Sequence, residues 1–384
     1  MLSQVLLGGV LAAGLPRAVL GASFSVPAQR VTVPGHVTLP PVANCKSPSG
    51  IASTREFDDQ GFWFANFTVG AGENLILLID SGSTDVYLNP GIYTPSSTSQ
   101  NLNENFTITF ETTNPDGSGT ETISGPLYED IVALDGTSLT LPAQILGTVT
   151  DPVSPPSFPH DGLVGFAGLS QSAINSTSWF QHLCDHGLVD ECRFGLAFET
   201  DDTGVQYFGY VDEERFYGDL SVAPVVPNEE WASWIDIAYD GKVIEENAWM
   251  VTDSGTTIIF GPIDSVQKLF DTAGIQSVLT EGSPSILTGY FSCSNPPTVG
   301  FGLPSTGNAT EAKATNSKVI SHKSTIFNIL PSQLVSNQTG DNCTSSIVGT
   351  DEFPFWLVGQ VFFQGKYVDH NHDAETMGFA YLAN

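Results

Sequence analysis

Two short segments of this chain carry an aspartate in the same unusual setting. Residues 80–84 read Asp-Ser-Gly-Ser-Thr and follow the apolar run 75–79. Residues 253–257 read Asp-Ser-Gly-Thr-Thr and follow the largely apolar run 249–252. Such runs are typical of buried strands, and a carboxylate at the end of one is costly to bury unless it is paired or hydrogen-bonded. The pattern therefore indicates that both acids have a chemical role.

A second motif repeats in the same order. Leu163-Val164-Gly165 follows the first acidic segment, and Leu357-Val358-Gly359 follows the second. An acidic motif followed by two apolar residues and a glycine, with the whole order repeated, is the mark of a duplicated domain. Two related lobes would bring two equivalent acids, Asp80 and Asp253, to the interface between them.

Two adjacent carboxyl groups have a defined chemistry. They do not both ionise cheaply, so they share one proton. The ionised member is a base that activates water, and the protonated member is an acid that protonates the carbonyl oxygen of a scissile amide. Gly82 and Gly255 allow tight turns whose amides face the carboxylates, while the Ser83 and Thr256 hydroxyls can donate to their outer oxygens. This chemistry needs no metal, no cofactor and no covalent nucleophile.

With these motifs the chain resembles the pepsin-like aspartic proteases, a family in which an aspartate pair sharing one proton is well known. The resemblance rests on both Asp-Ser-Gly segments, on both apolar-apolar-glycine motifs, and on residues 208–212 with 216–218, which match a strand at the end of the first lobe. It extends from about Phe57 to the C-terminus. It implies an all-β, bilobal acid protease fold with two β lobes related by a pseudo-two-fold axis and a few short helices.

The resemblance also implies roles for individual residues. Asp80 and Asp253 correspond to the catalytic pair of a secreted endopeptidase that works at acid pH and prefers hydrophobic residues near the scissile bond. The hairpin 106–132, with a turn predicted at 114–117, corresponds to the flap over the cleft. The positions that correspond to substrate-binding residues are Gly82, Ser83, Gly255, Thr256, Phe110 and Tyr87.

Three positions depart from the family pattern. Phe110 stands where the flap usually carries a Tyr, so the flap hydroxyl is missing. Tyr87 stands where a Trp is common, and a rearrangement could let it supply that hydroxyl. Gln360 replaces an Asp after the second glycine, and we expect it to be structural. These departures keep open a second class, a catalytically silent glycoprotein of the same fold that acts as a binding protein or inhibitor.

The composition indicates a globular, mostly β protein. The chain has 384 residues, with 38 glycines and 24 prolines that favour turns over long helices. Short alternating runs such as 66–69 and 106–110 are typical of strands. The formal net charge is −30, from 12 Lys and Arg against 42 Asp and Glu. This charge argues against nucleic acid and anionic membranes as partners, and it fits either a secreted soluble protein or one built for acid.

The order of segments predicts export and two lobes. Residues 1–22 are expected to be a secretory signal, because 5–15 is apolar but short and 19–22 offers a small-residue cleavage site. Residues 23–55 are rich in proline and predict a short propeptide or N-terminal arm. The N-terminal lobe with the flap is expected over 56–226, and the C-terminal lobe over 227–384. We expect a monomer without a membrane anchor that cleaves polypeptides, either secreted or in an acidic vacuolar compartment.

Cysteines and sequons support the same picture. The expected disulfides are Cys184 with Cys192 and Cys293 with Cys343, which leaves Cys45 unpaired. Asn-x-Ser/Thr sequons, the acceptors of N-linked glycans in exported proteins, occur at Asn66, Asn105, Asn175, Asn308, Asn337 and Asn342.

Helices are predicted over 172–186 and 264–272. His182 and His186 are spaced four apart in the first, which fits a surface helix face, since no HExxH pattern accompanies them. The segment 370–372, His-Asn-His, is expected to be a solvated turn rather than a metal site. A serine hydrolase is disfavoured because no GxSxG elbow is present. A glycosidase would also use two carboxylates, but it would not explain why they sit in duplicate motifs.

Overall fold

The computed structural model describes residues 52–59, 61–111, 120–151, 158–200, 203–226, 231–304 and 324–383. The predicted signal 1–22, most of the predicted arm 23–55, Cys45, the flap turn 114–117 and Asn308 lie outside these residues.

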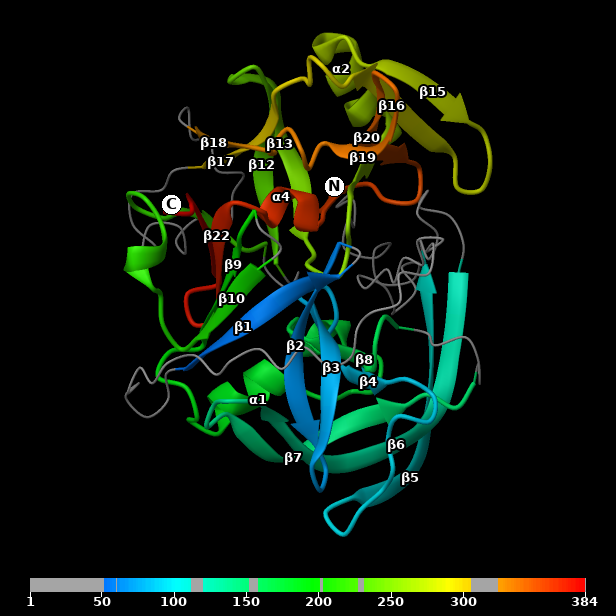
Figure 1. Cartoon of the computed structure of the whole chain (residues 1–384), viewed down its shortest axis with the longest axis vertical. Helices are drawn as coiled ribbons and strands as arrows, with labels where there is room; N and C mark the ends of the chain where they lie inside the picture. The colour runs from blue at the N-terminus through cyan, green and yellow to red at the C-terminus, as the bar shows by residue number, and fades with distance from the viewer. Residues whose placement is uncertain are drawn as a thin grey trace, which may run out of the picture.

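The described chain is mostly β, as predicted, and Figure 1 shows its strands gathered in an upper and a lower part. The strands are β1 (Ala52–Asp59), β2 (Phe62–Val69), β3 (Glu73–Asp80), β4 (Val86–Leu88), β5 (Gln100–Glu111), β6 (Thr120–Leu134), β7 (Thr140–Thr148), β8 (Gly162–Gly165), β9 (Arg193–Phe198), β10 (Thr203–Phe208), β11 (Ser221–Pro224), β12 (Ala232–Tyr239), β13 (Lys242–Thr252), β14 (Ile259–Pro262), β15 (Gln276–Thr280), β16 (Ile286–Ser292), β17 (Val299–Pro304), β18 (Ser324–Asn328), β19 (Val335–Thr339), β20 (Asn342–Thr350), β21 (Trp356–Val358), β22 (Lys366–Asn371) and β23 (Thr376–Tyr381).

Short helices connect the strands. They are α1 (Trp179–Asp185), α2 (Ile263–Ala273), α4 (Gln360–Phe363) and the 3₁₀ turns η1 (Leu169–Gln171) and η2 (Glu213–Arg215). The prediction over 264–272 is confirmed by α2, which ends at Gly274 in the left-handed conformation with φ 70°. The prediction over 172–186 is too long. Helix α1 begins only after Ser178, whose side chain accepts a hydrogen bond from the Gln181 amide and so fixes the start.

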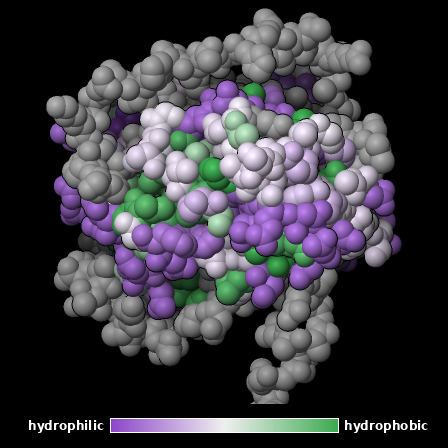
Figure 2. Space-filling view, turned by 90° about the horizontal axis from the view of Figure 1, so that it is seen from below, coloured by the Kyte–Doolittle hydropathy of each residue, from purple (hydrophilic) through white to green (hydrophobic). Residues whose placement is uncertain are grey.

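The strands form two large sheets. One has thirteen strands in the order β11-β23-β22-β9-β10-β1-β2-β3-β8-β4-β7-β6-β5, and the other has β15-β16-β20-β14-β21-β13-β12-β17-β18 with β19 paired to β20. The predicted long hairpin is confirmed, because β5 and β6 pair antiparallel with Ile108 opposite Ile123. On the face in Figure 2, hydrophilic residues cover much of the described surface and smaller hydrophobic areas lie between them.

The internal repeat predicted from the motifs is visible in the strand order. In the first sheet β3 pairs parallel with β8, β8 antiparallel with β4, and β4 parallel with β7. In the second sheet β13, β21, β14 and β20 pair in the same order and with the same directions. The same local sequence patterns therefore build the same four-stranded unit twice, which is the duplicated bilobal arrangement.

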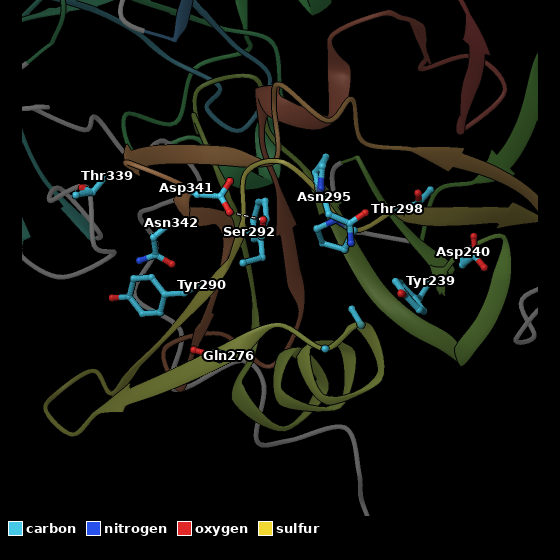
Figure 3. A pocket seen from close by; sticks show the side chains of 15 residues that line it. Tyr239, Asp240, Gln276, Tyr290, Ser292, Asn295, Thr298, Thr339, Asp341 and Asn342 are labelled. Atoms are coloured by element: carbon cyan, nitrogen blue, oxygen red, sulfur yellow. Dashed lines mark hydrogen bonds between the residues drawn. The ribbon is translucent and has the colours of Figure 1, made fainter.

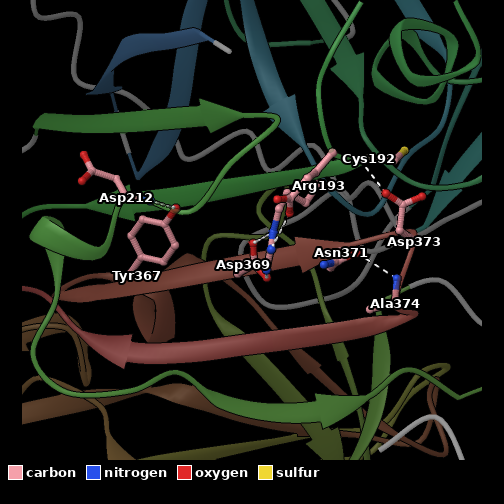
Figure 4. A network of polar contacts seen from close by, with 9 residues as sticks. Cys192, Arg193, Asp212, Tyr367, Asp369, Asn371, Asp373 and Ala374 are labelled. Atoms are coloured by element: carbon pink, nitrogen blue, oxygen red, sulfur yellow. Dashed lines mark hydrogen bonds and ion pairs between the residues drawn. The ribbon is translucent and has the colours of Figure 1, made fainter. Parts of the chain in front are cut away.

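The end of the chain returns to the first sheet. Strand β22 pairs with β9, and β23 pairs with both β22 and β11. Within this region Arg193 of β9 makes two contacts with Asp369 of β22, Nε to Oδ1 at 3.1 Å and Nη2 to Oδ2 at 2.7 Å (Figure 4). A second link joins the Cys192 amide to the Asp373 carboxylate at 2.9 Å. Sequence-distant strands are thus joined by charge as well as by backbone pairing.

The prediction of a solvated turn at 370–372 is wrong for His370. Strand β22 runs through Asn371 because it is hydrogen-bonded on both sides, and the turn begins only at His372. The His370 ring is fully buried, with its centroid 4.5 Å from that of Phe194 and 4.7 Å from that of Trp231. Burial lowers the pKa of His370 to about 3, so this imidazole is neutral above that pH.

Both expected disulfides are present. Cys184 is joined to Cys192, which closes the loop after α1, and Cys293 is joined to Cys343, which links the end of β16 to β20. The first disulfide closes a short loop of 8 residues' separation, while the second joins segments 50 residues apart in sequence.

The Arg193–Asp369 pair generates a stability prediction. Asp369 is 2% exposed, and its burial raises its pKa against the opposing effect of the guanidinium. Arg193→Ala leaves this carboxylate buried without its partner, so we expect the free energy of unfolding at neutral pH to fall by about 3–5 kcal/mol. Urea denaturation measures the change.

Arg215→Ala is the matched control, because Arg215 pairs with Glu199 at a site where both side chains are about 30% exposed. It should cost about 0–1 kcal/mol. Equal losses in the two variants would contradict the importance of the buried pair.

Candidate active site

The two aspartates of the repeated motif end equivalent strands. Asp80 is the last residue of β3, and Asp253 directly follows β13. Both side chains are fully buried, and a Cβ added to Gly255 of the second loop would lie 2.5 Å from Asp80 Oδ1, so the two loops meet at the acids. The structure therefore brings together the two acids that the sequence paired.

Each aspartate is held by the same two donors of its own loop. The Gly82 amide donates to Asp80 Oδ1 at 2.9 Å and the Ser83 hydroxyl to Oδ2 at 2.6 Å. In the second loop the Gly255 amide and the Thr256 hydroxyl make the corresponding bonds to Asp253, at 2.8 and 2.5 Å. The donation predicted for both hydroxyls is confirmed, and these bonds fix the orientation of each carboxyl group.

Serines 81 and 254 tie the two loops to each other. The Ser81 amide donates to Ser254 Oγ and the Ser254 amide to Ser81 Oγ, both at 2.9 Å. The Ser254 hydroxyl also donates to the Ile79 carbonyl at 2.7 Å. Our sequence reasoning missed this role, although the presence of the same hydroxyl residue in both copies was a usable signal. These bonds set the distance between the loops and so between the acids.

The apolar-apolar-glycine motifs brace the loops from behind. Gly165 lies opposite Asp80 in the parallel pair β3–β8, and a Cβ on it would lie 2.4 Å from the Ser83 carbonyl oxygen. A Cβ on Gly359 would lie 2.2 Å from the Thr256 carbonyl oxygen. Only glycine allows such close backbone approach, which explains why the motif accompanies each acid.

Gln360 has the structural role predicted for it. Its side-chain amide donates to the Ser254 carbonyl at 2.5 Å, and its backbone amide donates to the Thr256 carbonyl at 2.8 Å. Gln360 therefore hydrogen-bonds to two backbone carbonyls of the second loop without carrying a charge.

Tyr87 is packed inside the protein. It is 1% exposed, and its hydroxyl donates to Asp85 Oδ2 at 2.9 Å. Its ring lies 5.0 Å from that of Phe106 on β5, which links it to the base of the hairpin. A rearrangement that turned this hydroxyl toward a substrate would have to break the bond to Asp85. The side chain of Phe110 lies outside the described residues.

Asp85 is a buried acid close to the first loop that our sequence reasoning did not single out. It is 2% exposed and accepts bonds from the Ser172 hydroxyl at 2.6 Å and the Ala173 amide at 2.8 Å as well as from Tyr87. Burial raises its pKa, and these donors oppose the rise. Asp85 thus anchors residues 172–173 next to the first loop.

The electrostatics of the pair favour one shared proton. Burial is the main cause that raises the pKa of Asp80, and the bond from Ser83 opposes it. Burial also raises the pKa of Asp253 well above 3.8, and the negative charge of Asp80 raises it further. The pair therefore loses its two protons in separate steps, and the second proton leaves only at clearly higher pH. Such a pair can offer a base and an acid at the same time.

Among the residues that the structure describes, no group of three or more His, Cys, Asp or Glu side chains is placed to hold a metal ion. No helix in the same ranges is both long and apolar enough to span a membrane.

The fold and this site define a bilobal aspartic endopeptidase of the pepsin type. The model of the family "Eukaryotic aspartyl protease" matches residues 63–382, so the chain belongs to that family. It is 26% identical over 348 residues to an aspartic protease of Phaffia rhodozyma, covering 87% of this chain and 80% of that protein.

Other relatives carry similar names. Secreted aspartyl protease 1 of Malassezia globosa is 28% identical, with 79% of this chain and 70% of that protein covered. Pepsin A of Sus scrofa is 28% identical, with 82% of this chain and 80% of that protein covered. These names favour an enzyme over the alternative of a silent binding protein.

The Ser254 bonds generate a second prediction. Ser254→Ala leaves the Ser81 amide and the Ile79 carbonyl without these partners in a buried region. We expect a loss of about 1–3 kcal/mol in the free energy of unfolding. Urea denaturation beside Ser254→Thr, which keeps the hydroxyl, separates this effect from a change of packing. Equal losses of stability in the threonine and alanine variants would contradict the role given to the Ser254 hydroxyl.

Proposed function

We propose that Asp80 and Asp253 are the catalytic pair of this endopeptidase. The observation that carries the proposal is the matched geometry of the two acids, since both are fully buried and each accepts one amide and one hydroxyl bond from its own loop. The ionised aspartate takes a proton from a water molecule while that water attacks the peptide carbonyl. The protonated aspartate donates to the carbonyl oxygen.

The substrate is an extended polypeptide that lies across the two loops, under the hairpin β5–β6. Gly82, Ser83, Gly255 and Thr256 border the acids, so their backbones are in position to bond a peptide. Ile174 and Ile258 are partly exposed hydrophobic residues close in sequence to the anchored segment 172–173 and to Thr256. They support apolar subsites, and hence a preference for hydrophobic residues beside the scissile bond.

Acid pH is the proposed working range. The reaction needs the singly protonated pair, so activity falls as pH rises and the last proton leaves the pair. The formal charge of −30 supports the same range, because protonation of surface carboxylates at acid pH reduces self-repulsion.

We also propose that the protein is exported as a monomer, to the cell exterior or to an acidic vacuolar compartment. Support comes from the signal-like residues 1–22, from the sequons, and from the name "Secreted aspartyl protease 1" of the Malassezia globosa relative. Removal of 1–22 and then of part of 23–55 would yield the mature two-lobed enzyme, with lobes over 56–226 and 227–384.

Hydrolysis of an unfolded protein substrate tests the catalytic proposal. The mature wild-type chain should cut the substrate at acid pH and lose activity toward neutral pH. Asp253→Asn keeps the shape but cannot supply the shared proton, so its rate should fall by at least about 10²–10⁴-fold. Initial rates across the pH range measure both effects.

Asp271→Asn, an exposed acid on α2, is the matched control and should keep wild-type activity. Circular dichroism checks that each variant is folded. A folded, mature wild-type chain that leaves the substrate uncut at every pH would show a silent relative instead of an enzyme.

A further inference from the structure

The second sheet carries a pocket that takes no part in the site described above. Its volume is about 760 Å³, within the range of about 300–1,000 Å³ that is typical of ligand sites. It lies between the end of α2, the hairpin β15–β16 and the turn between β19 and β20 (Figure 3). None of the residues that line it belongs to the loops around Asp80 or Asp253.

The lining combines aromatic rings with amide and carboxyl groups. Tyr239 and Tyr290 are half-buried, so each offers a ring face and a hydroxyl, while Gln276 and Asn295 are exposed. Sugars present hydroxyl edges, which amides and carboxylates bond, and C–H faces, which pack on aromatic rings. The chemistry of this pocket therefore matches carbohydrate better than an apolar ligand.

One wall of the pocket contains a sequon. Asn342 lines the pocket and is exposed, and Asn342-Cys343-Thr344 has the sequence of an N-glycosylation sequon. The register places Tyr290 opposite Thr344 and Ser292 opposite Asn342. Since residues two apart on a strand share a face, Tyr290 and Asn342 lie on the same side of the sheet. Figure 3 shows the two side chains next to each other at one end of the pocket.

The face that carries Asn342 and Tyr290 continues onto the next strand, β15. Gln276 of β15 lies opposite Tyr290, so a sugar attached at Asn342 would meet the tyrosine first and the glutamine next. Next to Asn342, Asp341 accepts bonds from the Ser292 hydroxyl at 2.7 Å and the Ser294 amide at 3.0 Å. These bonds hold the rim of the pocket in place without a ligand.

We propose that the pocket binds the N-linked glycan attached to Asn342. The first sugars of this glycan pack on Tyr290 and hydrogen-bond to Gln276. The inference rests on the export proposed above, since only an exported chain is glycosylated. It assigns the glycan a place within the fold of the second lobe, where it covers the end of α2 and the β15–β16 hairpin.

Protection from a deglycosylating enzyme tests the proposal. The full chain is secreted from a yeast host, treated with endoglycosidase H in its native state, and glycan release is followed site by site by mass spectrometry. The Asn342 glycan should be released at least about tenfold more slowly than glycans at exposed sequons such as Asn105 or Asn175, which corresponds to about 1.4 kcal/mol of binding in the pocket. All sites should react alike after denaturation.

Variants separate pocket binding from other causes of slow release. Tyr290→Ala and Gln276→Ala should restore fast release at Asn342, while Tyr217→Ala, which removes a tyrosine that is 60% exposed and outside the pocket, should not. The proposal is overturned if Asn342 carries no glycan while other sequons do, or if its glycan is released as fast as theirs. A secreted chain without any glycan overturns the glycan proposal alone. A chain that is not exported overturns both the glycan proposal and the export proposal.

Discussion

Two carboxyl groups buried against each other are the constraint on which this structure depends. Charged carboxylates are costly to bury, and a pair is costlier still unless one member stays protonated. Four hydrogen-bond donors of the loops, an amide and a hydroxyl for each acid, offset part of this cost. The site is thus held by bonds that favour an ionised group while burial favours a neutral one. That balance suits an acid and a base that must act together.

The two acids must be placed accurately, and each of the two sheets positions one of them. Strands β3 and β13 bring the acids to the loops, and the glycines of β8 and β21–α4 let each brace approach the loop backbone closely. Serines 81 and 254 then lock one loop to the other. Farther away, β22 and β23 return to pair with β9 and β11, and the Arg193–Asp369 pair joins strands that are distant in sequence.

The features encoded in the repeated motifs could be predicted from the sequence. The features that depend on residues distant in sequence were missed. The duplicated motifs were enough to predict the bilobal fold, the meeting of the acids and the hydroxyl donors, because each is encoded within a few residues. Ser81 and Ser254 were missed because their partners lie in the other loop. His370 was assigned to a turn before the final strand, yet pairing with strands on both sides keeps it in a buried strand. Asp85 was missed because its donors, Ser172 and Ala173, are distant in sequence.

The shared proton is tested most directly by carbon-13 NMR of the chain labelled at its aspartate carboxyl groups, titrated beside Asp80→Asn to identify the pair. Burial and the charge of Asp80 raise the pKa of Asp253 well above 3.8, so two steps are expected. One carboxyl proton of the pair should leave first and the second at clearly higher pH, and replacing Asp80 should lower the pKa of Asp253 by removing a neighbouring charge. If both carboxyls ionise together near 3.8, and Asp253 does not respond to Asp80→Asn, the pair shares no proton and the account is wrong.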